Sequence, residues 1–304
     1  MAQILRRRAT AAGALLLGTA LLATACASNP ANSSSSGASS SASAGSDPKS
    51  LVPSAIKAKG TLVVAADASY APNEFFDTDG KTIIGMDADL AKAIGQELGL
   101  NVTLQNVTFD SIIPGMAAGK YDLGMSSFTD TKAREQTVDF VTYFSAGSSL
   151  MVKTGNPENL STSDTSLCGK KIAVEKGTTQ EQTDIPADNQ KCTAAGKPAI
   201  TPLSFDDQNG ANLALSSGRA DGVLADSPVA AYAAKQSNGQ FMIVGQPYGT
   251  APYGIAIPKG NGMAQAVLAA VKALMANGTY NQILTKWGIQ SGAITNPVIN
   301  GATS

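Results

Sequence analysis

Short apolar runs alternate with amphipathic segments along most of the chain. The run at residues 61–66 is rich in Val and Ala and predicts a strand. Residues 87–98 carry Leu90, Ile94 and Leu98 at helical spacing and end before a glycine, so they predict a helix. A repeated order of strand and helix is typical of α/β proteins with parallel sheets.

The predicted elements form two such sets followed by a short return. The first set adds strands at residues 102–106, 122–126 and 149–152. The second set and the return comprise strands at 171–174, 222–224, 241–244 and 253–258, and helices at 209–217, from Pro228, at 263–277 and at 280–287. Two sets with a return predict one lobe that is interrupted by another.

The N-terminus has the features of an export signal. Three consecutive arginines precede an apolar run at residues 11–23, which is too short to cross a membrane. The run ends in small residues before Cys26, which resembles a bacterial lipobox, in which the cysteine is lipidated and begins the mature chain. We expect a lipoprotein signal peptide at residues 1–25 and a lipid anchor on Cys26. An ordinary secretory signal with an incidental cysteine is the alternative.

The segment after Cys26 is mostly Ser, Ala, Gly and Asn. Such a composition cannot bury enough apolar surface to fold. Residues 26–50 are therefore predicted to be the lipidated cysteine and a flexible tether. Roughly 240 residues remain after the tether, enough for two modest lobes.

The two other cysteines of the chain are Cys168 and Cys192. In an exported protein such a pair is expected to form a disulfide. A metal or redox site is the alternative, but the spacing is far from C-x-x-C and the chain contains no histidine to complete a metal shell. We predict a structural disulfide that stabilises the fold by about 3 kcal/mol.

Charge and composition limit the classes of function. Removal of the predicted signal peptide takes three arginines and no acid, which changes the formal net charge from −1 to −4. A weakly acidic chain with few aromatics and no basic stripe does not suggest a nucleic-acid partner. The lack of histidine excludes a Ser-His-Asp or Cys-His catalytic centre, and no cofactor or metal is predicted.

The most informative segment is the predicted strand that ends near residue 126, with the polar residues after it. Ser126, Ser127 and Thr129 would gather at the carboxyl end of this strand, where open α/β sheets bind ligands. Arg134 follows and offers a planar fork of donors that matches a carboxylate. The same residues also fit a strand end, a polar turn and a solvated arginine.

This segment resembles the solute-binding proteins of amino-acid ABC transporters, family 3. The residues that carry the resemblance are Asp122, Thr131, Arg134, Val138, Asp139 and Phe140. Six other segments are similar to the family in the same order: residues 62–75, 85–90, 109–114, 177–180, 220–228 and 277–287. The resemblance covers about residues 61–288.

The resemblance implies a fold and a function. The fold would be an α/β clamshell of the type II periplasmic-binding-protein class, whose two discontinuous lobes are joined by crossover strands near residues 150–152 and 251–255. Lobe 1 would comprise residues 51–150 and 251–290, lobe 2 residues 151–250, and a C-terminal tail residues 291–304. The protein would be a monomer, lipid-anchored at the extracytoplasmic face of the bacterial cell membrane. It would bind an amino acid between its lobes and deliver it to an ABC permease.

The resemblance also assigns both charges of an amino-acid site. Arg134 would hold the α-carboxylate, and Asp226 would accept from the α-ammonium group. A buried site for a zwitterion needs both charges, because either one alone is costly. Asp226 precedes Pro228, which opens a predicted helix, so helix capping is its alternative role. Thr178 and Thr179, in a glycine turn before another helix, would offer backbone N–H groups to the same carboxylate.

The remaining candidates from lobe 1 concern the side chain of the ligand. Asp67, Tyr70 and Phe109 lie at predicted strand ends, where two aromatic rings can flank a side chain or a cation. Asp67 with Tyr70, and the run from Ser126 to Thr129, look similar to the branch that binds lysine, arginine, ornithine or histidine. These residues are expected to form the side-chain pocket.

Two residues depart from the family pattern, Asn73 and Glu175. Glu175 would add negative charge from lobe 2 if it faces the ligand; otherwise it points into solvent or pairs with Lys176. A carboxylate opposite a guanidinium gains a charge-assisted hydrogen bond, which a neutral amide does not offer. A cationic amino acid of the arginine, lysine and ornithine class is therefore predicted, with glutamine or another polar amino acid as the rival.

Two other classes of function remain open. One is an enzyme on the same scaffold, similar to cyclohexadienyl dehydratase. The presence of both Arg134 and Asp226 favours the binding of an intact amino acid over this activity. The other is a sensor or adhesin that binds a ligand without transport.

Overall fold

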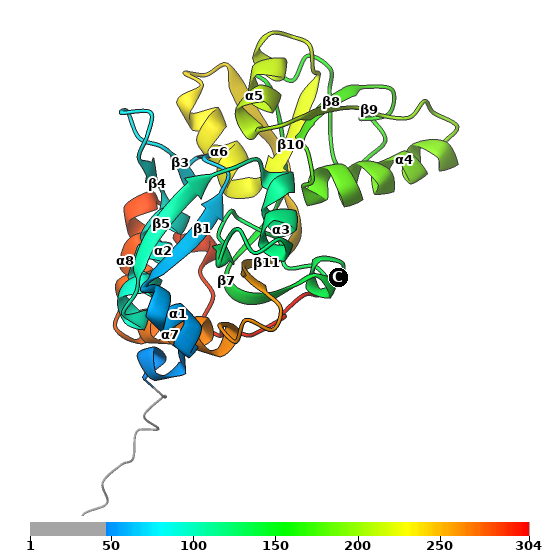
Figure 1. Cartoon of the computed structure of the whole chain (residues 1–304). Helices are drawn as coiled ribbons and strands as arrows, with labels where there is room; N and C mark the ends of the chain where they lie inside the picture. Colours follow the sequence, from blue (N-terminus) through cyan, green and yellow to red (C-terminus); the bar gives the residue numbers. More distant parts are fainter. Residues whose placement is uncertain (1–46, 304) are drawn as a thin grey trace, which may run out of the picture. The chain divides into compact units, whose positions relative to one another are not determined.

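The computed structural model describes residues 47–303 (Figure 1). The predicted signal peptide, Cys26 and most of the predicted tether lie outside these residues. The folded body begins earlier than the predicted boundary at residue 50, because Pro48–Leu51 form a 3-10 helix, η1. The Asp47 side chain accepts from the Lys49 N–H and caps this turn. The short helix α1 (Ser54–Lys59) follows.

The centre of the fold is one eight-stranded mixed sheet, with the order β5-β1-β6-β11-β7-β10-β8-β9. A second sheet, β2-β3-β4, is three-stranded and antiparallel, and its strands fall between β1 and β5 in the chain. The strands of the large sheet are β1 (Thr61–Ala66), β5 (Asn101–Asn106), β6 (Leu123–Gly124), β7 (Val138–Lys153), β8 (Lys171–Glu175), β9 (Thr201–Phe205), β10 (Gly222–Asp226) and β11 (Phe241–Pro258). Those of the small sheet are β2 (Ser69–Tyr70), β3 (Glu74–Phe76) and β4 (Ile83–Ile84).

Two long antiparallel strands, β7 and β11, connect the halves of the large sheet. β11 pairs with β6 on one side, and β7 pairs with β10 on the other. The half with β1, β5 and β6 forms lobe 1, and the half with β8, β9 and β10 forms lobe 2. This confirms the expected two-lobed α/β fold with two crossover strands.

The crossover in β7 lies earlier than predicted. Residues 150–152 already pair with β10 in lobe 2. The irregular part of the β7–β11 ladder joins residues 145–148 to residues 248–252, where the register shifts. Gly147 permits this approach, since a side chain there would collide with the carbonyl oxygen of Tyr248. The separate strands predicted at 149–152, 241–244 and 253–258 are therefore parts of two continuous strands.

Helices cover the sheet in both lobes (Figure 1). In lobe 1, α2, α7 and α8 pack apolar faces on one core, which includes Leu90, Ile94 and Leu284. Two further cores belong to lobe 2. The helices are α2 (Met86–Leu98), α3 (Phe109–Ala117), α4 (Ile185–Ala194), α5 (Gln208–Ser216), α6 (Ser227–Gln236), α7 (Ala264–Ala276) and α8 (Thr279–Trp287), with short turns η2 (Arg134–Gln136), η3 (Gln180–Asp184) and η4 (Gln290–Gly292).

Two segments outside the regular core are also fixed in place. The C-terminal tail lies along β7: the Thr142 N–H donates to Val298 O, and the Asn300 N–H donates to Phe140 O, both at 2.9 Å. The predicted disulfide between Cys168 and Cys192 is present, with 5.5 Å between the Cα atoms, and it ties α4 to the loop before β8. Both segments therefore belong to the folded body.

Candidate functional site

A small cavity lies between the ends of β1 and β6 in lobe 1 and of β8 and β10 in lobe 2. Eight of the eleven predicted ligand residues line it, which brings together side chains that are far apart in the sequence. The lining residues are Tyr70, Phe109, Ser127, Thr129, Arg134, Thr178, Thr179, Gln180 and Asp226. Asp67, Ser126 and Glu175 are buried beside this cavity but do not line it.

Arg134 supplies the positive charge of the cavity. Its guanidinium lies over the rings of Phe109 and Phe128, 5.3 and 5.4 Å from their centroids. Nη1 donates to Thr129 O and Nη2 donates to Gly177 O, both at 2.9 Å. Because a guanidinium has five N–H groups, donors remain for a carboxylate. Burial lowers the pKa of Arg134 to about 10, so the group stays charged at neutral pH.

Asp226 supplies the negative charge, at the junction of β10 and α6. Its side chain does not cap the helix. Instead, the Tyr253 hydroxyl donates to Oδ2 at 2.6 Å, and Gln180 Nε2 donates to Oδ1 at 2.8 Å. Burial raises the pKa of Asp226 to about 6, while these two hydrogen bonds and the Arg134 charge favour the ionised form. The carboxylate therefore faces the cavity with two donors holding it.

The turn between β8 and η3 forms the lobe 2 wall. Gly177 has a φ of 80°, which favours glycine, and its carbonyl accepts from Arg134 of lobe 1. The hydroxyl of Thr178 donates to Glu175 O at 2.7 Å, so this side chain holds the turn. The N–H groups at the start of a helical segment have no partner within the helix, which suits them to an anion.

Glu175 and Asp67 form an acidic wall beside the cavity. Glu175 is 1% exposed, and neither carboxylate oxygen has a hydrogen-bond partner among the described residues. Burial raises the pKa of Glu175 well above its ordinary value, and the neighbouring Asp67 charge raises it further. Lys176 does not pair with Glu175: its Nζ lies 2.9 Å from an Asp110 carboxylate oxygen in lobe 1. The interpretations in which Glu175 points into solvent or pairs with Lys176 are therefore wrong.

Asp67 and Ser126 are buried beside the cavity without lining it. Asp67 Oδ2 accepts from the Phe109 N–H at 3.1 Å, at the start of α3, and Oδ1 accepts from the Ser69 N–H at 3.1 Å. The Ser126 hydroxyl accepts from the Asp67 N–H at 2.9 Å and donates to Glu74 at 3.2 Å. The position of Ser126 therefore does not support its predicted contact with a ligand. The hydrogen bond from the Asp67 N–H to the Ser126 hydroxyl fixes the backbone of Asp67 instead.

Two residues that hold the site were missed by the sequence analysis. Gln180 lines the cavity and donates from Nε2 to both Asp226 and the Ser148 hydroxyl. It directly follows the predicted Thr178–Thr179 turn, and this adjacency was the available signal. Tyr253 lies on β11, 27 residues from Asp226, and nothing in its local sequence indicates the contact.

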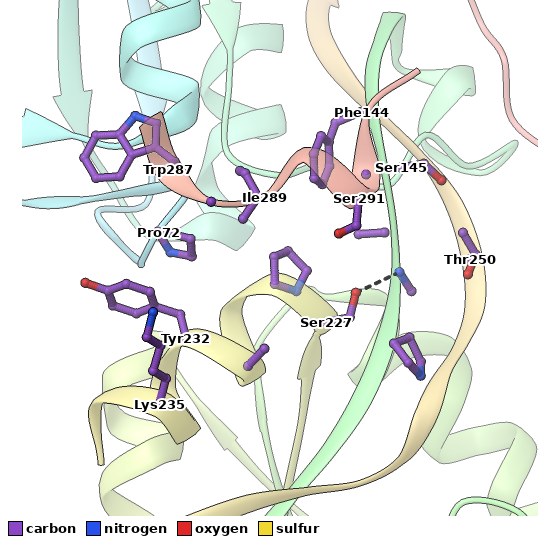
Figure 2. A pocket seen from close by; sticks show the side chains of 17 residues that line it. Pro72, Phe144, Ser145, Ser227, Tyr232, Lys235, Thr250, Trp287, Ile289 and Ser291 are labelled. Atoms are coloured by element: carbon purple, nitrogen blue, oxygen red, sulfur yellow. Dashed lines mark hydrogen bonds between the residues drawn. The ribbon is translucent and has the colours of Figure 1, made fainter. Parts of the chain in front are cut away.

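A larger cavity of about 530 Å³ lies elsewhere, between α6, the segment after α8 and the crossover strands (Figure 2). Phe144, Tyr232 and Trp287 line it, and the Gly147 N–H donates to the Ser227 hydroxyl at 3.4 Å across its wall. Among residues 47–303, no carboxylate and none of the predicted ligand residues lines this cavity. It therefore offers no negative charge to an ammonium group.

Within residues 47–303, no group of three or more Cys, Asp or Glu side chains is placed to hold a metal ion. Nor does this range contain a helix that is long and apolar enough to cross a membrane.

Comparison with known proteins places these features in a family. Residues 62–290 match the model of bacterial extracellular solute-binding proteins, family 3. An arginine-binding protein of Corynebacterium glutamicum is 37% identical over 257 residues, which is 83% of this chain and 82% of the relative. The chain therefore belongs to family 3 of the bacterial extracellular solute-binding proteins.

Solved structures agree with this assignment. An ancestral arginine-binding protein bound to arginine is 38% identical, with a TM-score of 0.68, and the match covers 75% of this chain and 98% of that one. An ancestral amino acid-binding protein, described as a precursor of cyclohexadienyl dehydratase, is 36% identical with a TM-score of 0.68, covering 77% and 97%. The similar proteins thus include both binding proteins and a forerunner of an enzyme.

Proposed function

We propose that this protein is the substrate-binding component of an ABC importer and binds a cationic L-amino acid between its lobes. The observation that carries the proposal is the pair of opposite charges in one cavity, Arg134 from lobe 1 and Asp226 from lobe 2. This pair matches the carboxylate and the ammonium group of a zwitterion. The arginine-binding relatives support the ligand class.

The acidic wall supports a cationic side chain. Asp67 and Glu175 are both buried, and the Glu175 oxygens lack hydrogen-bond partners among residues 47–303. A guanidinium or ammonium head group would supply the missing donors and the opposite charge. Tyr70 and Phe109, whose ring centroids are 6.4 Å apart, would flank the aliphatic stem. Glutamine remains the rival ligand, since its amide also offers donors.

The ligand preference is tested by calorimetric titration with arginine, lysine, ornithine and glutamine. Arginine or another cationic amino acid is expected to bind at least tenfold more tightly than glutamine. Glu175→Gln should reduce that preference, because it removes the charge and keeps the shape. Glutamine binding tighter than every cationic amino acid would refute the ligand class, and an unchanged preference in Glu175→Gln would clear Glu175 of the role.

The location of the protein is part of the proposal. The family is extracellular. The signal peptide at residues 1–25 and the small residues before Cys26 support attachment to the outer face of the cell membrane through lipid on that cysteine. Cys26→Ala should release the protein from the membrane fraction of the native host. Retention of this variant in that fraction would contradict the anchor.

The second candidate function is an enzyme, favoured by the similarity to a dehydratase precursor. The site argues against it, because Arg134 and Asp226 are placed to hold an amino acid intact and the chain lacks histidine. Incubation with a cyclohexadienyl carboxylic acid, followed by chromatography of the products, distinguishes the two. Turnover that is lost in Asp226→Asn would favour the enzyme.

A further inference from the structure

Two acids without a basic partner lie behind the wall of the cavity in lobe 1. Glu74 belongs to β3 and Asp87 to α2, and they are 1% and 0% exposed. Neither forms an ion pair with a Lys or Arg among residues 47–303. Two buried, ionised carboxylates that act on each other would be very costly without a cation, so one of the two negative charges must be neutralised in another way.

Glu74 accepts hydrogen bonds from the hydroxyl groups of both serines at the end of β6. Ser126 Oγ donates to Glu74 Oε1 at 3.2 Å, and Ser127 Oγ donates to Oε2 at 3.1 Å. Asn73 Nδ2 in turn donates to Ser127 Oγ at 2.9 Å. A hydroxyl has one proton and two acceptor sites. Ser127, which lines the cavity, therefore has only an acceptor site left for a ligand.

Asp87 holds the backbone of the same serine. The Ser127 N–H donates to Asp87 Oδ2 at 3.0 Å, and the Tyr143 hydroxyl donates to the same oxygen at 2.8 Å. Ser127 has a φ of 51°, in the left-handed region that non-glycine residues rarely adopt, so its conformation depends on such support. Within the described part of the chain, the other oxygen, Asp87 Oδ1, accepts no hydrogen bond from an N–H group or a hydroxyl.

The groups that face this pair are acids and phenols. Besides burial, the charges of Asp87 and Asp67 raise the pKa of Glu74. Burial and the charges of Glu74 and Asp87 in turn raise the pKa of the Tyr143 and Tyr253 hydroxyls, which lie on the crossover strands. Burial raises the pKa of Glu74 well above its ordinary value, and the Asp87 charge raises it further. Burial raises the pKa of Asp87 to about 6, while the hydrogen bonds from the Ser127 N–H and the Tyr143 hydroxyl, and the neighbouring Glu74 carboxyl group, favour its ionised form.

We propose that Glu74 and Asp87 share one proton, which is donated to Asp87 Oδ1, and that this singly charged pair fixes Ser127 as an acceptor for the ligand's α-ammonium group. The pair is a positioning device, since neither acid lines the cavity. The shared proton supplies the one donor that Asp87 Oδ1 lacks and removes one of two buried charges. The assignment of the ammonium group rests on the function proposed above.

The first test addresses the proton by infrared difference spectroscopy of the full folded protein without added ligand. A band of protonated carboxyl groups is expected at pH 7 in the wild type, and its intensity should be lower in Glu74→Gln. Asp89→Asn is the matched control, because Asp89 lies on the same helix but is paired with Lys286 at the surface. Equal bands in the wild type and Glu74→Gln would overturn the shared proton.

Stability against pH gives an independent check. Folding raises the pKa of the pair, so its contribution to stability is present at low pH and lost as the pH rises through the folded value. Urea midpoints of the wild type should therefore fall relative to those of Glu74→Gln between pH 5 and pH 8. A constant difference across this range would contradict the shared proton.

The second test addresses positioning by titration with arginine. Glu74→Gln keeps one acceptor and a donor toward Asp87, so its affinity should stay within fivefold of the wild type. Glu74→Ala removes both, and its affinity should fall at least tenfold. If Glu74→Ala does not fold, Ser127→Ala supplies the same measurement, with the same tenfold loss expected. Wild-type affinity in either variant that folds would overturn the positioning role.

Failure of the proposed function can be told apart from failure of this inference. If the wild type binds no amino acid, the proposed function and the role toward the ammonium group are both refuted. The infrared and urea results still decide whether the pair shares a proton.

Discussion

Arg134 illustrates how a half-buried guanidinium group is held in place. Two aromatic rings flank its guanidinium, and two carbonyl oxygens, one from each lobe, accept from its terminal nitrogens. These contacts order the Arg134 side chain, which would lower the cost of binding the carboxylate of the proposed ligand. The role of Arg134 is open to a direct measurement.

Arg134→Ala should weaken arginine binding by about 2–5 kcal/mol, because the ligand carboxylate would be left desolvated without its partner. Calorimetry measures the change. Arg219→Ala is the control: Arg219 also lies over an aromatic ring, that of Phe205, but it does not line the cavity. An affinity within threefold of the wild type would remove Arg134 from the site.

The pH dependence of binding should follow Asp226. Burial raises the pKa of this carboxyl to about 6, above its ordinary value, so it becomes protonated below pH 6 and loses its attraction for an ammonium group. Affinity should therefore fall as the pH drops, by up to about tenfold per pH unit. The fold is not weakened by this group there, since a raised pKa contributes stability at low pH.

Titrations between pH 5 and pH 8 test this expectation. Asp226→Asn should bind weakly with a flat profile over the same range, because the titrating group is gone. A wild-type affinity that is constant from pH 8 to pH 5 would be incompatible with Asp226 as the acceptor.

Residue chemistry predicted the charges of the site better than their supports. Arg134, Asp226 and the Thr178–Thr179 turn lie in recognisable local patterns at strand ends. The positions of Glu74 and Tyr253 could not be derived in this way, because their partners are 53 and 27 residues away and depend on how the strands pack. Ser126 was also predicted to contact the ligand, whereas in the fold it does not line the cavity.

At the scale of elements, the periodicity of hydrophobic residues correctly predicted the long, amphipathic helices and strands. The helices α2 and α7 and the strand β1 carry enough apolar residues to be recognised. The small sheet of β2, β3 and β4 was missed because its strands have only two or three residues. β9 was missed because Pro202 breaks its pattern, which is tolerated at the sheet edge where it lies. α4 was missed because only Ile185 and Cys192 of its residues are buried.

The disulfide compensates for the small apolar surface of α4. Cys168→Ser with Cys192→Ser should lower the free energy of unfolding by about 3 kcal/mol, since a closed loop in the unfolded chain would be released. Urea denaturation of the oxidised wild type and the double variant measures this. Neither cysteine lines the cavity, so arginine affinity should remain within threefold at a temperature where both proteins are folded. An unchanged urea midpoint would show that the bridge has no stabilising role.

At the scale of the whole folded body, the lobes meet around the cavity. Besides the contact of Arg134 with Gly177, the Gln208 N–H donates to the Ser69 hydroxyl at 3.1 Å, and Lys176 pairs with Asp110 at 2.9 Å. Each contact joins one lobe to the other, so each is available only when the lobes are closed. Ligand that bridges the lobes would favour this closed form by its differential affinity. Hinge closure in periplasmic binding proteins is a known example of such a transition.

The resemblance to family 3 predicted two crossover strands, but it placed the crossover in β7 near residues 150–152, which already pair with β10 in lobe 2. The crossover depends on pairing along the whole length of β7 and β11, including register shifts that local residue patterns do not carry. The close approach of the two strands at Gly147 is likewise visible only in the fold.

Closure can be tested at Gly177, where the lobes approach most closely around Arg134. A Cβ added at Gly177 would lie 2.9 Å from the Asp110 Cβ in the other lobe, closer than such atoms normally come. Gly177→Ala should therefore oppose closure and weaken arginine binding at least tenfold. Gly155→Ala is a matched control, because Gly155 also has a positive φ, of 84°, but a Cβ there would meet nothing within 4 Å.

Both substitutions carry the same backbone strain, of about 1 kcal/mol, so both should lower the urea midpoint of the ligand-free protein to a similar extent. Only Gly177→Ala should also lose affinity, and small-angle scattering should show less compaction of this variant on addition of arginine. Equal affinities in the two variants would mean that the approach of Gly177 to Asp110 is not required for binding. A loss of affinity in Gly155→Ala as large as that in Gly177→Ala would assign the effect to backbone strain instead of closure.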